Sequence, residues 1–306
     1  MILTFVPNPA IDKTIVLPGF KTGQTFRVGE VLELAGGKGF NFARALTRLG
    51  QSTLVVGPVG GHRGRLLVQL AFKEGLNCDC LELPGELRTC LTIIDPQANY
   101  LHTELYEKGP TLSKDDWDRL VAKVASHFAS TDRLVVCGSF PSGVPETGLA
   151  EVLKQARVAG LEVILDTYGP QFHQALSQGP NLVKINQHEA GEAVGFEVKS
   201  PQTAQTAARQ LQKRGAQAVV ITLGSWGAVG LAEDGQFVSC RAPQLASLSP
   251  IGSGDSFLAG LVAGLAGNQG FDKALKLAVA AGAANTLQIG AGRFELEQLE
   301  RILQSD

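Results

Sequence analysis

Cysteine is scarce in this 306-residue chain, and its pattern argues against a disulfide-stabilised secreted fold. The five cysteines are an odd number, they form no C-x-x-C pair, and Cys78 and Cys80 are too close for an easy disulfide. The five histidines are scattered along the chain, so no His/Cys zinc spacing is present. We therefore expect a protein of the reduced cytoplasm.

An excess of charge and a long apolar run are also lacking. Lys and Arg total 27 against 29 Asp and Glu, a net charge of −2 that gives no reason to expect nucleic acid or an anionic membrane as partner. Met1–Val6 has no basic leader, so we expect no signal peptide. The uncharged runs behind Asp255 and over Leu277–Gly292 are too short to span a membrane.

What the chain does contain is typical of a globular protein with a large core. Hydrophobic residues make up 44% and charged residues 18% of the sequence, and 36 glycines fit many loop-to-helix turns. No internal repeat or linker divides the chain. We therefore expect a single domain over residues 1–306.

Short apolar runs alternate with segments of helical periodicity over most of the sequence. Helices are expected over Pro145–Ala159 and Pro201–Arg214. The continuous runs, which are typical of strands buried on both faces, are Leu134–Val136, Val163–Leu165, Leu182–Ile185 and Val219–Ile221. The alternation predicts an α/β fold: a mostly parallel sheet with helices on both faces, and ligands at the carboxyl ends of its strands.

Two stretches break this alternation, at about residues 12–34 and 88–106. Lys13–Leu17 and Phe26–Leu34 are predicted strands in the first stretch. In the second, Thr89–Asp95 and Tyr100–Tyr106 are predicted strands around a turn at Pro96. Because no helix follows either pair, we expect a small antiparallel β-sheet outside the main fold that serves as a lid.

The most informative segment is Pro250–Phe257, a glycine-containing loop that leads into an apolar helical pattern. Free backbone N–H groups and the helix dipole make such a helix start a good phosphate site. Asp255 would repel a phosphate there, unless it takes a proton from an attacking hydroxyl. Taken alone, the loop favours a simpler interpretation, in which Asp255 is an N-cap.

Several familiar motifs are missing. Gly36–Gly39 comes nearest to a P-loop but lacks the spacing and the hydroxyl, and no G-x-G-x-x-G follows the first strand. No second histidine follows His188 at the spacing that a zinc protease needs. Leu258 replaces the second glycine of a nucleophile elbow around Ser256. A dehydrogenase is thus the weakest of the enzyme classes considered.

Three segments together resemble the ribokinase/PfkB family of sugar kinases. Gly36–Leu46 is similar to the first family signature, Ile251–Ser256 to the second, and Asn186 with Glu189 to the N-x-x-E motif between them. The resemblance covers essentially the whole chain and is closest to the hexose-phosphate branch, the 1-phosphofructokinases and tagatose-6-phosphate kinases. The segments that point to this branch are Asn8–Asp12, Gly85–Cys90, Thr103–Leu105 and Gly138–Gly143.

The resemblance implies a ribokinase-like fold, with a Rossmann-like core and a β-sheet lid. It also implies ATP-dependent phosphorylation of a ketohexose phosphate, fructose 1-phosphate or tagatose 6-phosphate, to the bisphosphate. Asp255 would be the catalytic base, and the N–H groups of Gly252, Ser253 and Gly254 would hold the charge on the transferring phosphoryl group. The combined motifs therefore favour the functional interpretation of Asp255 over the cap.

The resemblance also assigns the sugar site. Asp12 and Asn41 would hydrogen-bond sugar hydroxyls, with Gly37 allowing close approach. The alternatives are an Asx-turn for Asp12 and a polar first-turn residue for Asn41.

A phosphate already on the substrate would explain the positive charge of Lys38 and Arg88, with Ser139 adding a hydroxyl contact. For either cation the alternative is a surface salt bridge, and for Ser139 a turn cap. If the two cations do not serve a phosphate, an unphosphorylated sugar or a nucleoside becomes the substrate.

The nucleotide site is expected along the next strands. Lys184 and Asn186 would contact ATP, and Asn186 with Glu189 would hold Mg²⁺ through water, unless the latter two only form a capping box. Thr222, Gly224 and Gly227 resemble the family's ATP-phosphate turn, although a plain hairpin would look similar. Asn285 is expected on the adenine side, with helix packing as the alternative.

Two departures from the family pattern add expectations. Phe40 and Phe42 replace smaller residues beside Asn41, which we expect to reshape the sugar pocket. Ser249 and Pro250 stand just before the glycine loop, where many relatives have other polar pairs. The resemblance therefore leaves open whether a monovalent cation binds near this loop, as it does in some members of the family. A homodimer through the lid edges is also compatible with the pattern, as is a catalytically silent phosphosugar sensor, although a sensor would not need Asp255.

Overall fold

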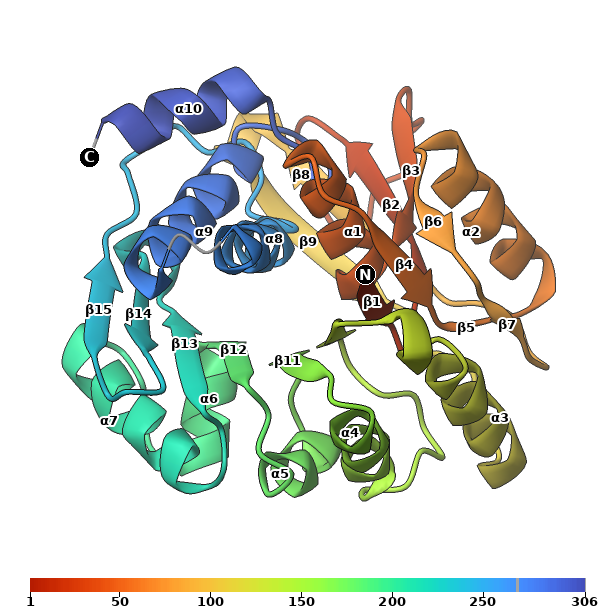
Figure 1. Ribbon diagram of the computed structural model, residues 1–306. Coiled ribbons are helices and arrows are strands. Elements are labelled where there is room, and N and C mark those ends of the chain that lie inside the picture. The colour runs from red at the N-terminus through yellow and green to blue at the C-terminus, as the bar shows by residue number, and fades with distance from the viewer. Residues whose placement is uncertain (268–269, 306) are drawn as a thin grey trace.

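The computed structural model describes residues 1–267 and 270–305, which form a large sheet enclosed by helices and a smaller sheet beside it (Figure 1). Seven neighbouring strands of the large sheet, β13, β12, β11, β10, β1, β4 and β6, run parallel to one another. β14 and β15 extend the sheet beyond β13 with antiparallel pairing. In spatial order the strands are β15 (Phe237–Cys240), β14 (Ala228–Leu231), β13 (Ala218–Thr222), β12 (Leu182–Asn186), β11 (Glu162–Asp166), β10 (Arg133–Cys137), β1 (Ile2–Phe5), β4 (Thr53–Val56) and β6 (Asn77–Cys78).

Helices cover both faces of this sheet (Figure 1). One face packs against α3 (Lys114–Ala125), α4 (Gly148–Val158), α5 (Pro170–Leu176), α6 (Gln187–Val194) and α7 (Pro201–Lys213). The other packs against α1 (Lys38–Arg48), α2 (Gly61–Lys73), α8 (Ser253–Ala266), α9 (Phe271–Asn285) and α10 (Leu296–Gln304). The predicted α/β class is confirmed.

Alternation along the strands decides which side chains face α8. In β10, Leu134 and Val136 join the core on the α3–α5 side, while Val135 joins the core on the α8 side. The same alternation turns Ile164 of β11 and Leu182 of β12 toward α8. The next residues on that face are Asp166, which ends β11, and Lys184, in the middle of β12, so charged groups follow the apolar ones in both strands.

The smaller sheet has the order β3 (Val31–Gly36), β2 (Ala10–Val16), β8 (Thr89–Asp95) and β9 (Leu101–Tyr106). β2 pairs with β3 and β8 with β9 in antiparallel fashion, as predicted. The central pair, β2 with β8, is parallel, so the expectation of a wholly antiparallel small sheet is wrong at this pair. Residues 26–30 precede β3 and are not a strand.

Helices α8 and α9 pack tightly against each other. An added Cβ at Gly260 would lie 2.8 Å from Ala278 Cα, and one at Gly264 would lie 2.6 Å from Ala274 Cα, so the two backbones touch through small residues. Within the described residues, no helix combines the length and apolarity that a membrane span requires.

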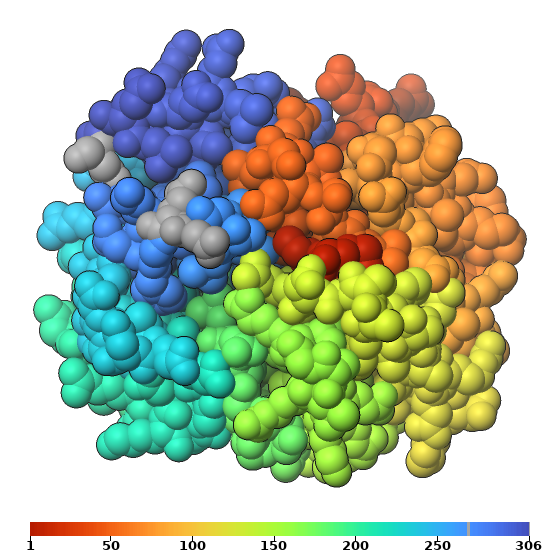
Figure 2. Space-filling model, in the orientation of Figure 1, coloured from red at the N-terminus to blue at the C-terminus, as the bar shows by residue number. Residues whose placement is uncertain are grey.

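The N-terminal strand, β1, lies inside the large sheet, and the start of the chain reaches the surface (Figure 2). In Figure 2 the start of the chain, in red, lies near the middle of the visible face, between the orange segment that includes α1 and the yellow-green segments. β1 is accordingly flanked by β4 and β10. Phe40 and Phe42, on α1 beside this strand, are fully buried in the core, so the structure gives no support to the expectation that they reshape the sugar pocket.

Candidate active site

The loop before α8 turns through a glycine that no other residue could replace without strain. Gly252 is the residue before the first helical turn and has a left-handed conformation, with φ of 78°. An added Cβ there would lie 2.4 Å from Ala291 Cα. Helix α8 then begins at Ser253, so Asp255 is the third helical residue and the N-cap interpretation is wrong.

Backbone donors at this helix start are available to an anion. The N–H of Ser253 donates to Pro250 O at 3.1 Å, so one of the three predicted donors is engaged within the loop. In the described part of the chain, the N–H groups of Gly252 and Gly254 have no acceptor. Lys184 Nζ lies close by, 3.2 Å from where a Cβ of Gly254 would be. A helix N-terminus and an ammonium group thus meet at one point, which suits a phosphoryl group.

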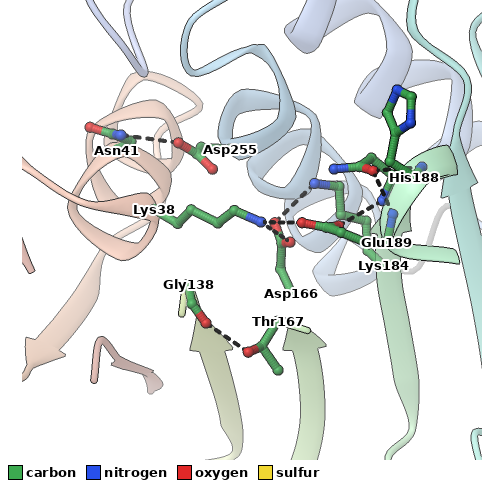
Figure 3. A network of polar contacts seen from close by, with 10 residues as sticks. Lys38, Asn41, Gly138, Asp166, Thr167, Lys184, His188, Glu189 and Asp255 are labelled. Carbon is green, nitrogen blue, oxygen red and sulfur yellow. Dashed lines mark hydrogen bonds and ion pairs between the residues drawn. The ribbon is translucent and has the colours of Figure 1, made fainter. Parts of the chain in front are cut away.

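Asp255 is buried, with 7% of its surface exposed, and it accepts a hydrogen bond of 3.0 Å from Asn41 Nδ2 (Figure 3). Burial is the main cause that raises the pKa of Asp255 to about 6, and the negative charge of Asp166 adds to it. Lys38, Lys184 and Asn41 act in the opposite direction. Asp255 is therefore mostly ionised at neutral pH yet more basic than an ordinary aspartate, which suits a general base.

Asn41 connects Asp255 to the predicted sugar ligand Asp12. Its Nδ2 also donates to Asp12 Oδ2 at 3.1 Å, and Gly37 N donates to the same oxygen at 3.3 Å. Because Asp12 bonds to residues of α1 and its start, the Asx-turn interpretation is wrong. Burial raises the pKa of Asp12, against the opposing effects of Asn41, Arg44, Gly37 and Arg88.

Lys38 and Lys184 share one buried carboxylate (Figure 3). Lys38 Nζ lies 2.9 Å from Asp166 Oδ1, and Lys184 Nζ lies 2.9 Å from Asp166 Oδ2. Lys38 also lies 3.2 Å from Glu189 Oε1. Burial alone would raise the pKa of Asp166, but the two ammonium groups hold it below its usual value. For Lys38, burial is outweighed by Asp166, Glu189 and Asp255, which raise its pKa.

Asp166 is therefore a central site residue that the sequence reasoning missed. Its side chain is inaccessible to solvent and holds two cations beside Asp255. A signal was present, since Asp166 directly follows the apolar run Val163–Leu165 at the carboxyl end of a predicted parallel strand. Ligand-binding groups gather at such positions.

Asn186 and Glu189 form a capping box at the start of α6. Asn186 Oδ1 accepts from the N–H groups of His188 and Glu189, each at 2.9 Å, and Glu189 Oε2 accepts from Asn186 N at 2.9 Å. The other oxygen of Glu189 faces Lys38. Among the described residues no cluster of three or more His, Cys, Asp or Glu could hold a metal. A carboxylate such as Glu189 fits Mg²⁺ that retains most of its water.

A cavity of about 730 Å³ opens beside the start of α8. Thr222, Gly224 and Gly227 line it on one side, and Ser253 and Gly254 line it on the other. β13 and β14 pair as an antiparallel hairpin around this turn, so the hairpin alternative is confirmed, while the ATP-phosphate contact stays a prediction. The volume is in the range of cofactor sites.

Asn285 lies behind the glycine loop rather than in this cavity. It is fully buried; its Nδ2 donates to Ile251 O, and its Oδ1 accepts from Ser256 Oγ and Gly292 N, each at 2.8 Å. Both polar atoms of Asn285 are thus engaged in holding the loop. The structure agrees with the packing alternative and gives no support to the expected adenine contact.

Arg88 and Ser139 meet at the segment that precedes β2. Arg88 donates to Asn8 O at 2.9 Å and to Pro9 O at 3.4 Å, and Asn8 Nδ2 donates to Ser139 Oγ at 3.2 Å. Lys38 belongs to the Asp166 network, and within the described residues it shares no hydrogen bond or ion-pair partner with Arg88. The two predicted phosphate ligands therefore approach the site from different elements.

Comparisons with known proteins agree with this geometry. The model of the pfkB family carbohydrate kinases matches residues 8–298. Tagatose-6-phosphate kinase of Staphylococcus epidermidis is 28% identical, over 99% of this chain and 98% of its own length. 1-Phosphofructokinase of Rhodobacter capsulatus is 34% identical, over 85% of this chain and 82% of its own length. Phosphofructokinase-2 from Escherichia coli, solved in complex with potassium, is 28% identical, with a TM-score of 0.90 over 99% of this chain and 98% of its own.

Proposed function

This chain belongs to the pfkB family of carbohydrate kinases, and we propose that it transfers a phosphoryl group from ATP to a hydroxyl of a ketohexose phosphate. Fructose 1-phosphate and tagatose 6-phosphate are the candidate substrates, supported by relatives named 1-phosphofructokinase and tagatose-6-phosphate kinase. The observation that carries the proposal is the position of Asp255, a buried base whose pKa is raised to about 6, at a helix start beside two lysines.

The proposed transfer uses Asp255 as a general base. Its carboxylate takes the proton of the sugar hydroxyl while the hydroxyl oxygen bonds to phosphorus and the bond to the leaving ADP breaks. The N–H groups of Gly252 and Gly254, together with Lys184, hold the charge of the transferring group. Such fixed donors are effective because they need no reorganisation when the charge develops.

Asp12 and Asn41 would orient the acceptor sugar, and Gly37 would allow it to approach closely. Arg88 and Ser139 would bind the phosphate that the substrate already carries, with Lys38 adding positive charge from α1. Lys38 already pairs with two carboxylates, but 29% of its side chain is still exposed. This exposure supports the proposal that Lys38 can also reach a bound phosphate. A planar guanidinium such as that of Arg88 is well suited to phosphate.

The nucleotide is proposed to occupy the 730 Å³ cavity, with its phosphates toward Gly254. Bound Mg²⁺ would neutralise charge on those phosphates, and Glu189 with Asn186 would hold the ion through water. A monovalent cation near Ser249 is proposed as well, supported by the potassium complex of the Escherichia coli phosphofructokinase-2.

The smaller sheet is proposed to act as the lid that excludes water from the reaction. Its outer strands expose Val31, Leu101, Leu105 and Tyr106, which supports pairing of two subunits through this sheet. Escherichia coli phosphofructokinase-2 has been solved in a tetrameric inhibited form, so an oligomer is known for a similar protein.

ADP release tests the proposal directly. The purified chain is mixed with ATP and Mg²⁺ and then with fructose 1-phosphate, tagatose 6-phosphate, fructose 6-phosphate, ribose or adenosine. We expect the highest kcat/KM with fructose 1-phosphate or tagatose 6-phosphate. A higher value with ribose or adenosine would overturn the substrate class, and binding without ADP release from any compound would indicate a sensor.

A further inference from the structure

Cys78 and Cys80 share one side of an extended segment at the edge of the molecule. β6 ends at Cys78 and pairs with β4, while β7 (Leu81–Glu82) pairs with β5 (Pro58–Val59), so the chain continues from one sheet to the next. Asp79, between the cysteines, pairs instead with Lys123 at 2.6 Å and His127 at 2.9 Å. Side chains alternate along extended chains, and both cysteines pack against the core that α2 helps to form.

A cavity of about 520 Å³ is lined by residues of this segment and of α2. Cys78 and Cys80 line it from the strand side, and Gly64, Arg65 and Val68 line it from the helix. Both cysteines are partly exposed, whereas Cys90, Cys137 and Cys240 are buried. A solute that enters this cavity therefore meets two thiols together.

The two thiols are also close enough for each to affect the ionisation of the other. A hydrogen bond from Cys80 is the main cause that lowers the pKa of Cys78, against the opposing effects of burial and of Asp79. The same bond, with burial, raises the pKa of Cys80 well above its usual value. Cys78 is thus the more easily ionised thiol, and thiolates are the reactive form.

We propose that Cys78 and Cys80 form a thiol–disulfide exchange site for small disulfides that enter this cavity. The Cys78 thiolate attacks one sulfur of the small disulfide, which forms a mixed disulfide and releases one small thiolate. Cys80 then loses its proton to solvent and attacks Cys78 Sγ, which releases the second small thiolate. Two protein thiols are oxidised, and one small disulfide is reduced to two thiols.

The close spacing of the two cysteines determines the character of the product. A disulfide between residues two apart is strained, and strained disulfides are reduced more easily than structural ones. The spacing that argues against a permanent disulfide is therefore compatible with a reversible one. Because β6 is the edge strand of the large sheet, the site lies apart from the Asp255 site among β11, β12 and α8.

The test exposes the full-length protein to oxidised glutathione and follows free thiols and intact mass. In the wild type we expect rapid loss of two thiols with no retained adduct, and recovery with a dithiol reductant. Cys80→Ser should retain one glutathione on Cys78, because the resolving thiol is missing. Cys78→Ser should react about tenfold more slowly, because it lacks the activated thiolate.

Cys240→Ser is the matched control, since it removes a cysteine outside the cavity and should react as the wild type does. Thermal unfolding of each variant checks that it is folded. Equal rates for Cys78→Ser and wild type would overturn the proposal, as would a stable wild-type adduct or a Cys80→Ser protein that acquires none.

Discussion

Asn41 and Asp255, which are 214 positions apart in the sequence, are joined by a hydrogen bond of 3.0 Å from Asn41 Nδ2 to Asp255 Oδ2. The same nitrogen donates to Asp12 Oδ2 at 3.1 Å. One amide group therefore sets the distance between the proposed catalytic base and the proposed sugar ligand. The orientation of that amide is fixed in turn by Arg44 Nη1, which donates to Asn41 Oδ1 at 2.9 Å.

Replacing Arg44 should affect stability and activity in separable ways. Arg44→Met leaves Glu74 without its buried partner, and we expect the free energy of unfolding to fall by about 3–5 kcal/mol in urea titrations. Arg44→Met with Glu74→Met removes the unpaired charge and should recover much of that stability. The double variant should still have a low kcat/KM, because Asn41 is no longer oriented. Full recovery of kcat/KM would show that Arg44 has only a structural role.

Asn285→Ala should weaken the glycine loop. Loss of its bonds to Ile251, Ser256 and Gly292 is expected to lower the free energy of unfolding by about 2–4 kcal/mol. Steady-state kinetics should show a larger fall in kcat than rise in the KM for ATP. A raised KM for ATP with normal kcat and stability would instead support a direct adenine contact.

Arg88→Ala should weaken phosphosugar binding selectively. Loss of a charged hydrogen-bonding group from a phosphate contact is expected to raise the KM for the phosphosugar about 10- to 100-fold and to leave the KM for ATP nearly unchanged. Arg88→Lys keeps the positive charge but loses the planar guanidinium group. Its KM for the phosphosugar should lie between those of the wild type and Arg88→Ala. Equal effects on both substrates would rule out the phosphate role.

The pH dependence of kcat/KM should report the ionisation of Asp255. The base is active when deprotonated, and its pKa is raised to about 6, so activity is present above this pH and falls as the pH decreases through it. Asp166 should not contribute to this fall in activity near pH 6, because its pKa is below the usual aspartate value. A profile that stays flat down to about pH 3.8, the ordinary aspartate value, would contradict the assignment.

Local patterns predicted much of the fold, because they reflect local physics. Thr89–Asp95 is a strand with the predicted bounds, and the helix that begins at Pro201 ends one residue before the predicted end. Continuous apolar runs identified the parallel strands, and the glycine loop identified the start of α8. The parallel pairing of β2 with β8 could not be predicted, since no local pattern records which strands of two hairpins meet.

The site was only partly predictable, because its contacts join distant segments. Asp166 receives Lys38 from 128 residues away, and Asn285 binds the loop at Ile251 from 34 residues away. Neither relation leaves a spacing pattern in the sequence. The capping role of Asn186 was predicted as an alternative because it involves only its near neighbours.

The turnover of Asp255→Asn tests the central assignment most directly. The variant should fold at least as well near neutral pH, because the raised pKa means that ionisation of the buried carboxylate opposes folding. With fructose 1-phosphate or tagatose 6-phosphate and ATP, we expect kcat to fall about 10²- to 10⁴-fold while both substrates still bind. A folded Asp255→Asn protein with near wild-type kcat would show that Asp255 is not the base.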